Sequence, residues 1–204
     1  MYLNQKIMNI LLSSFSLLLI GISAFSQDSI QNIGIDHLEN GKYRKAIKQF
    51  TKALEVEADS SDIYYNRGNA YFDLEKYSKA IIDYSNALMV NAEYLDAYTN
   101  RGISYGRLKM YREARIDYNV VLMAEPQNDL IYYNRGLDYY DAGEYQEAVD
   151  DFTSAIKIDP DFANAFLNRA ISNYLLGIDG CSDLMEAKYL GVDVHPKTIE
   201  CVCN

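Results

Sequence analysis

Hydrophobic residues recur along this chain with the spacing of amphipathic helices. In residues 77–88 they lie three or four positions apart, which places them on one helix face. That face consists of Tyr77, Ala80, Ile81, Tyr84, Ala87 and Leu88. Residues 64–71 carry a second such face, formed by Tyr64, Arg67, Gly68 and Tyr71. The short segment 73–76 separates the two stretches, so the sequence predicts two helices joined by a tight connection.

This helix pair is repeated with a period of 34 residues. Glycines mark the period at Gly34, Gly68, Gly102 and Gly136, and Ala170 takes the next place. Small residues follow at Ala46, Ala80, Ala114 and Ala148, and aromatic residues at Phe50, Tyr84, Tyr118 and Phe152. Pro126 and Pro160 end the second helix of two repeats, because proline lacks an amide hydrogen and clashes with the preceding turn. A fixed period indicates supersecondary units that stack and share a core.

We divide the chain into five repeats and two ends. The repeats are residues 27–60, 61–94, 95–128, 129–162 and a degenerate 163–191, preceded by residues 1–26 and followed by a tail of residues 192–204. The fifth repeat departs from the pattern, since Ala170 replaces glycine and its second helix is shortened. We interpret the tail as a C-terminal cap, because stacked repeats need covered ends. Pro196 suits the first position of a short final helix.

These columns resemble the tetratricopeptide repeat family, which has the same period and the same order of small, aromatic and proline positions. The resemblance covers nearly all of residues 27–190. It implies an all-α fold, a right-handed superhelical solenoid of about five helix–turn–helix repeats with a short C-terminal cap. Such solenoids have a concave groove that usually holds another protein, so the resemblance also implies a protein partner.

An asparagine occupies one column in all five repeats, at Asn32, Asn66, Asn100, Asn134 and Asn168. Asparagine is a mediocre helix former, because its side chain competes for backbone hydrogen bonds. The resemblance places this column on the groove, where some family members use asparagines to bind the main chain of an extended peptide. A carboxamide suits that role, since it both donates and accepts. The alternative is a solvated residue, or one that forms hydrogen bonds within the groove.

By the same resemblance, aromatic and amide residues flank this column. The candidate peptide-binding residues are Asn66, Asn100, Asn134, Asn168, Tyr65, Asn69, Phe72, Tyr133 and Tyr140. Aromatic side chains contribute much of the binding energy at interfaces. The sequence therefore predicts a peptide-binding surface on the first helices of the repeats.

An arginine column and an aspartate column lie sixteen residues apart. Arg67, Arg101, Arg135 and Arg169 form the first, and Asp83, Asp117 and Asp151 form the second. The first repeat has Ile33 and Gln49 at these places, so it lacks both charges together. We expect structural ion pairs between the two helices of each repeat. The alternative is that the arginines bind an acidic partner.

The first 26 residues are apolar apart from Lys6, several serines and a few other polar residues. Small residues, Ala24 and Ser26, precede Gln27 in the pattern of a signal-peptide cleavage site. We predict cleavage between Ser26 and Gln27, a secreted or periplasmic protein, and no membrane insertion after cleavage. The alternative is an uncleaved N-terminal anchor, because about 20 apolar residues can span a bilayer.

The cysteines are confined to the C-terminal part, at Cys181, Cys201 and Cys203. Residues two apart on a helix point to different sides, so Cys201 and Cys203 cannot both face Cys181. The segment 177–191 with its cysteine-containing tail resembles the closing unit of secreted tetratricopeptide proteins. That resemblance favours a Cys181–Cys203 disulfide. A metal site is a weak alternative, and we predict none.

Charge and motifs argue against two other functional classes. The formal net charge is −10 and the pI about 4.6, which disfavours nucleic acid as a partner. Residues 102–106 match G-x-S-x-G, but they lie in a predicted helix without the strand that a hydrolase elbow needs. We predict no catalytic residues and no cofactor. The predicted function is a non-catalytic scaffold of the bacterial envelope that binds another protein. The alternatives are self-assembly through the convex face or an end, and carbohydrate binding.

Overall fold

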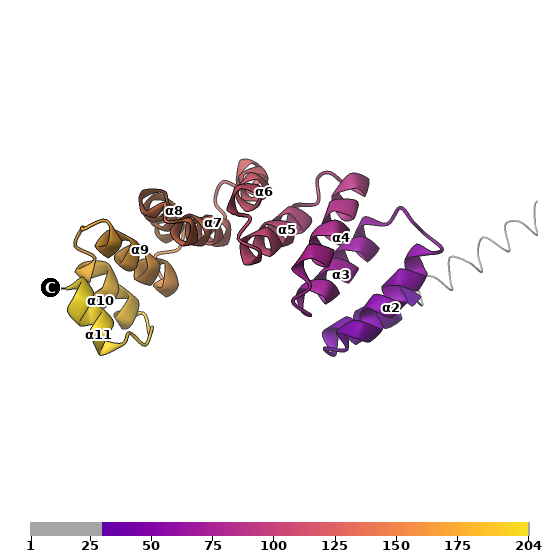
Figure 1. Ribbon diagram of the computed structural model, residues 1–204, viewed down its shortest axis with the longest axis horizontal. Helices are drawn as coiled ribbons and strands as arrows, with labels where there is room; N and C mark the ends of the chain where they lie inside the picture. Colours follow the sequence, from indigo (N-terminus) through magenta and orange to yellow (C-terminus); the bar gives the residue numbers. More distant parts are fainter. Residues whose placement is uncertain (1–29, 204) are drawn as a thin grey trace, which may run out of the picture. The chain divides into compact units, whose positions relative to one another are not determined.

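The structure, a computed structural model, describes residues 30–203. Within these residues the chain forms α-helices joined by short connections, and no residue is in a strand. The chain divides into two compact units, Met1–Ala92 and Glu93–Asn204, which we describe separately (Figure 1).

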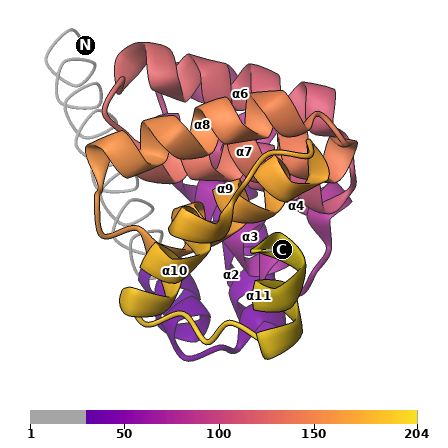
Figure 2. The same ribbon diagram turned by 90° about the vertical axis from the view of Figure 1, so that its left-hand side faces the viewer.

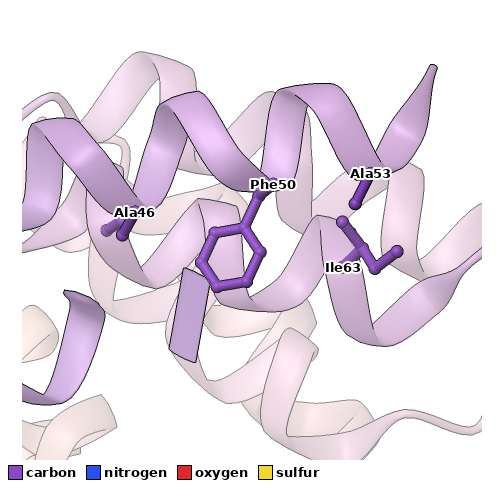
Figure 3. Close-up of a cluster of buried hydrophobic side chains, with 5 residues drawn as sticks. Ala46, Phe50, Ala53 and Ile63 are labelled. Carbon is purple, nitrogen blue, oxygen red and sulfur yellow. The ribbon is translucent and has the colours of Figure 1, made fainter. Parts of the chain in front are cut away.

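The first unit contains three complete helices after the helical residues 30–39. They are α2 (Tyr43–Leu54), α3 (Ser61–Phe72) and α4 (Tyr77–Val90). α3 packs against both α2 and α4. One cluster of its buried core consists of Ala46, Phe50, Ala53, Ile63 and Ala70. Figure 3 shows Ala46, Phe50 and Ala53 projecting from α2, with Ala53 close to Ile63 of α3.

The second unit contains three helix pairs and a final short helix. Its elements are α5 (Leu95–Arg107), α6 (Tyr111–Ala124), α7 (Asp129–Ala142), α8 (Tyr145–Ile158), α9 (Ala163–Leu175), α10 (Cys181–Tyr189) and α11 (Pro196–Val202). Each helix from α5 to α10 packs against the next along the chain. We call α3, α5, α7 and α9 the A helices of their repeats, and α4, α6, α8 and α10 the B helices.

The glycine column exists because an aromatic ring lies directly on it. A Cβ atom added to Gly68 would lie 2.7 Å from a ring carbon of Tyr84. The same contact recurs at Gly34 with Phe50, Gly102 with Tyr118 and Gly136 with Phe152. Real side chains do not approach this closely, so glycine lets the A and B helices of one repeat pack around a buried ring.

The fifth repeat solves the same packing problem with different residues. Ala170 replaces the glycine, and Leu184 of α10 takes the place of the ring; both are fully buried. A leucine is smaller than a tyrosine, so the extra methyl group of alanine fits. Ala170 and Leu184 share their core with Val194 and Val202, which come from the C-terminal tail.

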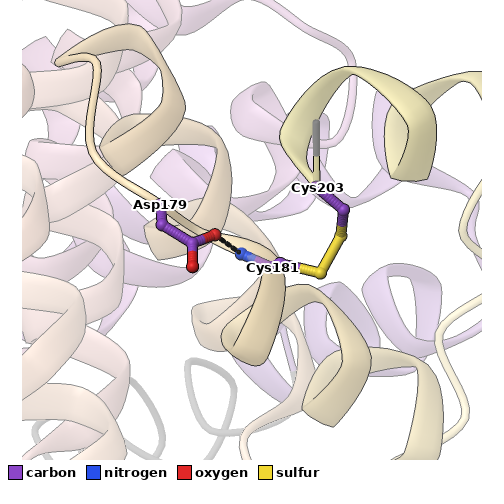
Figure 4. The surroundings of a disulfide bond; sticks show 3 residues. All are labelled: Asp179, Cys181 and Cys203. Carbon is purple, nitrogen blue, oxygen red and sulfur yellow. Dashed lines mark hydrogen bonds between the residues drawn. A yellow bond between two sulfur atoms is a disulfide. The ribbon is translucent and has the colours of Figure 1, made fainter.

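A disulfide ties that tail to the fifth repeat. Cys181, the first residue of α10, is bonded to Cys203, which follows α11 (Figure 4). The Asp179 carboxylate accepts a hydrogen bond of 2.8 Å from the Cys181 amide. Figure 2 faces this end, where α9, α10 and α11 pack together. The tail therefore covers the last repeat, and Cys201 is a free, exposed thiol.

The predicted fold class, an all-α tetratricopeptide solenoid with a short C-terminal cap, is confirmed. The helix predicted to begin at Pro196 is α11. Residues 61–94, 95–128 and 129–162 each enclose one helix pair. The predicted signal peptide and its cleavage site lie outside the described residues. Among the helices of residues 30–203, none is long and apolar enough to cross a membrane.

Candidate functional site: the A-helix face

The arginines of the column form ion pairs with aspartates of their own repeats. Nε and Nη2 of Arg67 donate to the two carboxylate oxygens of Asp83 at 2.7 Å each. The same two-point pairing joins Arg101 to Asp117 and Arg135 to Asp151, at 2.7–2.8 Å. Paired hydrogen bonds of this kind are strong and fix the geometry of both partners. Each pair links the A and B helices of one repeat.

The remaining surfaces of these guanidinium groups are also occupied. Nη1 of Arg67 donates to Thr51 at 3.2 Å, and Nη1 of Arg135 donates to Asn119 at 2.5 Å. Thr51 lies on α2 and Asn119 on α6, in each case the second helix of the preceding repeat. The guanidinium carbon of Arg135 also lies 5.5 Å from the ring centre of Tyr132. The hydrogen bonds to Asp151 raise the pKa of Arg135 above its ordinary value. These contacts favour the structural role over binding of an acidic partner.

A fourth pair of the same kind joins Arg169 to Asp183 at 2.7 Å. Its members are fourteen residues apart, because the second helix of the fifth repeat is shortened at its start: Asp183 is the third residue of α10, whereas Asp151 is the seventh of α8. Nη1 of Arg169 donates to Thr153 of α8 at 3.1 Å, so this repeat is tied to its neighbour as well.

The side chains of the asparagine column differ in whether they form hydrogen bonds within the fold. The amide of Asn168 on α9 donates to the Tyr133 hydroxyl on α7 at 2.9 Å. The Asn66 and Asn134 side chains are half-buried and make no hydrogen bond within residues 30–203. These two carboxamides can therefore both donate to and accept from a ligand without breaking a contact of the fold.

The flanking candidates are half-buried and pack onto the repeat cores. Tyr65 lies 5.9 Å from the ring of Tyr84, and Tyr133 lies 4.7 Å from the ring of Phe162. Asn69 accepts a hydrogen bond of 2.8 Å from the Tyr84 hydroxyl, which gives it a structural partner.

Phe72 and Tyr140 each contact the first tyrosine of the next helix, with ring centres 5.4 and 5.7 Å apart. The aromatic candidates are therefore partly exposed, and each ring contacts a neighbouring aromatic side chain.

A cavity of about 260 Å³ lies among α5, α6 and α7, and opens to solvent. Its lining residues are Ile103, Gly106, Arg107, Lys109, Tyr111, Tyr118, Asn134, Leu137, Asp138 and Asp141. Asn134 was predicted from the sequence as a peptide-binding residue, whereas Asp138 was not singled out. The available signal was that Asp138 stands in a column whose other A-helix members are small, namely Ala70, Ser104 and Ser172.

Asp138 is a buried carboxyl with an unpaired oxygen. The residue is 7% exposed, and its Oδ2 has no hydrogen-bond partner. Burial, followed by the charge of Asp141, raises the pKa of Asp138 from 3.8 to about 7, while Arg115 and Arg107 oppose this rise more weakly. Desolvation disfavours the charged form of a carboxyl, which is the physical cause of the largest contribution.

Models of the tetratricopeptide repeat family match residues 32–98 and residues 130–162. Residues 99–129 between these matches carry the same glycine, arginine and aspartate columns at Gly102, Arg101 and Asp117. The chain is a tetratricopeptide repeat (TPR) protein.

Solved structures similar to this TPR protein carry the name MamA. "MamA AMB-1" is 20% identical with a TM-score of 0.72, covering 86% of this chain and 98% of its own. "MamA 41-end from Desulfovibrio magneticus RS-1" is 18% identical with a TM-score of 0.75, covering 85% of this chain and 94% of its own. At these identities the likeness shows the fold. No curated protein matches the chain in sequence.

One further sequence motif of the TPR protein has a structural explanation. Ser104, the serine of G-x-S-x-G, is fully buried within α5, and its hydroxyl donates to the Asn100 carbonyl oxygen at 2.7 Å. A hydroxyl bonded to its own helix is not presented as a nucleophile. Among the described residues, no group of three histidine, cysteine or carboxylate side chains could hold a metal ion.

Proposed function

We propose that this TPR protein is a non-catalytic scaffold whose A-helix face holds an extended segment of a partner protein. Asn66 would make main-chain hydrogen bonds in the first unit, and Asn100, Asn134 and Asn168 would do so in the second. The observation that carries the proposal is the pair of half-buried, unengaged carboxamides at Asn66 and Asn134.

The surroundings of these asparagines support binding of a peptide. Tyr65 and Tyr133 are each the neighbour of a column asparagine, and both are anchored against a buried aromatic ring. An anchored ring loses little conformational freedom when a ligand covers its exposed part, so little of the binding free energy is lost. The asparagines would read the peptide backbone, and the rings would set side-chain preference.

The cap supports a location outside the cytoplasm. The Cys181–Cys203 bond is a structural disulfide, and such bonds persist in oxidising compartments. Together with the predicted signal peptide, this favours a secreted or periplasmic scaffold of the bacterial envelope.

An affinity capture tests the proposal. The full chain and a variant carrying Asn66→Ala, Asn100→Ala and Asn134→Ala would be immobilised and exposed to envelope extract from the source cell. We expect a partner that the first retains and the variant loses. A matched variant, Asn164→Ala, changes an exposed asparagine of α9 outside the column and should retain the partner. Equal retention by all three proteins would contradict the proposal, provided that their helical content by circular dichroism is the same.

A second candidate function, docking through the B helices, has its own support. Ile82 and Met89 of α4 are 59% and 80% exposed, and Ile116 and Met123 of α6 are 56% and 85% exposed. The members of each pair lie seven residues apart, so they share one helix face. The same positions of α8 hold Asp150 and Lys157. Exposed apolar residues of this kind are typical of interaction surfaces.

Light scattering on the purified chain tests this second candidate. If the apolar faces mediate self-association, Met89→Lys and Met123→Lys should each shift the mass from an oligomer towards a monomer. If the wild-type chain is monomeric across the accessible concentration range, self-association is ruled out. Capture of the same partner by these lysine variants and by the wild type would place that partner elsewhere.

A further inference from the structure

The cavity among α5, α6 and α7 results from two paired departures from the repeat pattern. Gly106 stands where the other A helices have Phe72, Tyr140 and Tyr174. Asp138 stands where they have alanine or serine. A Cβ atom at position 106 would lie 2.6 Å from Oδ1 of Asp138, so the glycine leaves room for the carboxyl. The missing aromatic ring and the added carboxyl therefore belong to one local arrangement.

A third departure leaves a hydroxyl in the same cavity without a partner. In the second repeat the Tyr84 hydroxyl donates to Asn69. Tyr118 is the equivalent residue of the third repeat, but the place of Asn69 is taken by Ile103. Within residues 30–203 the Tyr118 hydroxyl makes no hydrogen bond. The cavity wall thus holds three oxygen acceptors that the described fold does not use, from Asp138, Tyr118 and Asn134.

We propose that this cavity binds the primary ammonium group of a lysine side chain carried by the bound segment, with Asp138 as its counter-ion. The inference deepens the proposed function and rests on it for the identity of the ligand as a protein segment. The cavity binds a charge, whereas the asparagine column binds a main chain, so the two sites contribute separately to recognition.

The chemistry of the cavity matches an ammonium group. An ammonium carries three donors and no acceptor, and the wall offers a carboxylate, a hydroxyl and an amide oxygen. Ile103 and Leu137 supply apolar wall against which the four methylene groups of a lysine can pack. A buried carboxylate without a counter-ion is unfavourable, so an arriving cation would relieve that cost as well as form hydrogen bonds.

Other charged groups face the cavity, and none forms an ion pair with Asp138 among the described residues. Asp141 on α7 adds negative charge, while Arg107 on α5 and Lys109 in the following turn line the cavity as exposed residues. Arg115 on α6 is held by Glu144 at 2.6 Å. Arg107 is the competitor within the chain, because a change in its side-chain conformation could bring its guanidinium to Asp138.

The test uses a lysine with blocked ends, Nα-acetyl-lysine methylamide, as the probe. Nα-acetyl-norleucine methylamide is the uncharged control of similar shape. Each would be titrated into the full chain labelled with ¹³C at its aspartate carboxyl groups. The Asp138 resonance is identified by its loss in Asp138→Asn. We expect the lysine probe, and not the norleucine probe, to shift this resonance with saturation.

Variants decide where the probe binds. Asp138→Asn should weaken the lysine probe at least about tenfold, the loss expected for a charged hydrogen bond. Asp161→Asn removes one exposed charge from the same unit and should change the dissociation constant less than about twofold. Saturable binding that Asp138→Asn leaves unchanged would overturn the proposal. Binding that appears only in Arg107→Gln would also overturn it, because Arg107 would then be the natural occupant.

The lysine titration and the affinity capture can contradict their proposals separately. If the asparagine variants retain the partner but the lysine probe saturates at Asp138, the cation site exists without the proposed main-chain recognition. If the asparagine variants lose the partner and the probe does not bind, the groove binds a segment whose charge is irrelevant at this place.

Discussion

The junction of α5 with α7 and the junction of α7 with α9 use the same columns but satisfy their polar groups differently. At the second junction Asn168 donates to the Tyr133 hydroxyl, and the Ser172 hydroxyl donates to the carbonyl oxygen of its own helix at 2.7 Å. At the first junction the position equivalent to Tyr133 is Thr99, which is shorter than tyrosine, and Asp138 replaces the serine. Neither Asn134 nor Asp138 finds a partner among residues 30–203.

This difference shows how a repeat protein can place a specific site on a uniform scaffold. The arginine–aspartate pairs are kept at both junctions, and glycine packs against a ring in every repeat but the fifth, where Ala170 and Leu184 take these places. The changes, Thr99 and Asp138, fall on side chains of the A helices. There a polar group can lack a hydrogen-bond partner while the packing between the A and B helices is preserved. Within residues 30–203, Asn134 and Asp138 make no side-chain hydrogen bonds at the first junction, whereas Asn168 and Ser172 make them at the second.

The largest effect is expected from the shared framework. Arg135→Ala would leave the buried Asp151 carboxylate without its counter-ion and cut the link to Asn119 on α6. We expect the free energy of unfolding to fall by about 3–5 kcal/mol, measured by urea denaturation. Arg112→Ala removes an exposed arginine of α6 and should change it by less than about 0.5 kcal/mol. Similar losses in both variants would show that the pair is dispensable.

The next effect concerns the unpaired carboxyl. Because folding raises the pKa of Asp138 from 3.8 to about 7, the folded protein retains a proton that the unfolded chain has released between these pH values. The contribution of Asp138 to stability therefore becomes more unfavourable as pH rises from about 4 to about 7, reaching on the order of 4 kcal/mol at most.

Asp138→Asn should therefore stabilise the protein increasingly over this pH interval and then by a constant amount. The groups that face Asp138 are Arg107 on α5, Arg115, Tyr111 and Tyr118 on α6, Lys109 in the turn and Asp141 on α7, and they stay unchanged. Thermal unfolding at pH 5 and at pH 8 checks the sign. A variant that is less stable than wild type at pH 8 would show that Asp138 has a partner in solution.

A smaller effect tests whether Gly106 and Asp138 form one arrangement. Gly106→Ala places a methyl group against Oδ1 of Asp138, whereas in an Asp138→Ser background that contact is relieved. We expect Gly106→Ala to be more favourable in the serine background by about 1 kcal/mol in a double-mutant cycle. Additive effects of the two substitutions would show that Gly106 and Asp138 are not energetically coupled.

The smallest effect lies at the second junction. Tyr133→Phe removes the hydroxyl that accepts from Asn168, and should lower the free energy of unfolding by about 0.5–1.5 kcal/mol. Thr99→Val at the first junction makes a similar loss of a hydroxyl where no bond to Asn134 is formed, and should change stability less. Equal losses of stability in Tyr133→Phe and Thr99→Val would show that the two junctions do not differ in the hydrogen bonding of these hydroxyls.

The repetitive features of this protein were readable because they obey period and spacing. Arg67 and Asp83 lie sixteen residues apart in register with two other pairs, and the structure joins them as two-point ion pairs. The pairing of Cys181 with Cys203 followed from a resemblance of the tail, since spacing alone left Cys201 open. The partner of Asn168, and the cavity beside Asp138, were not foreseen, because both depend on contacts between helices of successive repeats.

The sequence by itself determined the fold class, the repeat and the ion-pair columns, because helical periodicity and a fixed period repeat the same local constraint many times. Only the tertiary structure decided which polar groups remain unpaired. Asp138 differs from Ser104 and Ser172 by one side chain, but its environment depends on Gly106 and Tyr118 of neighbouring helices. The burial and hydrogen bonding of a group are set by everything packed against it, and no single column of the sequence contains that information.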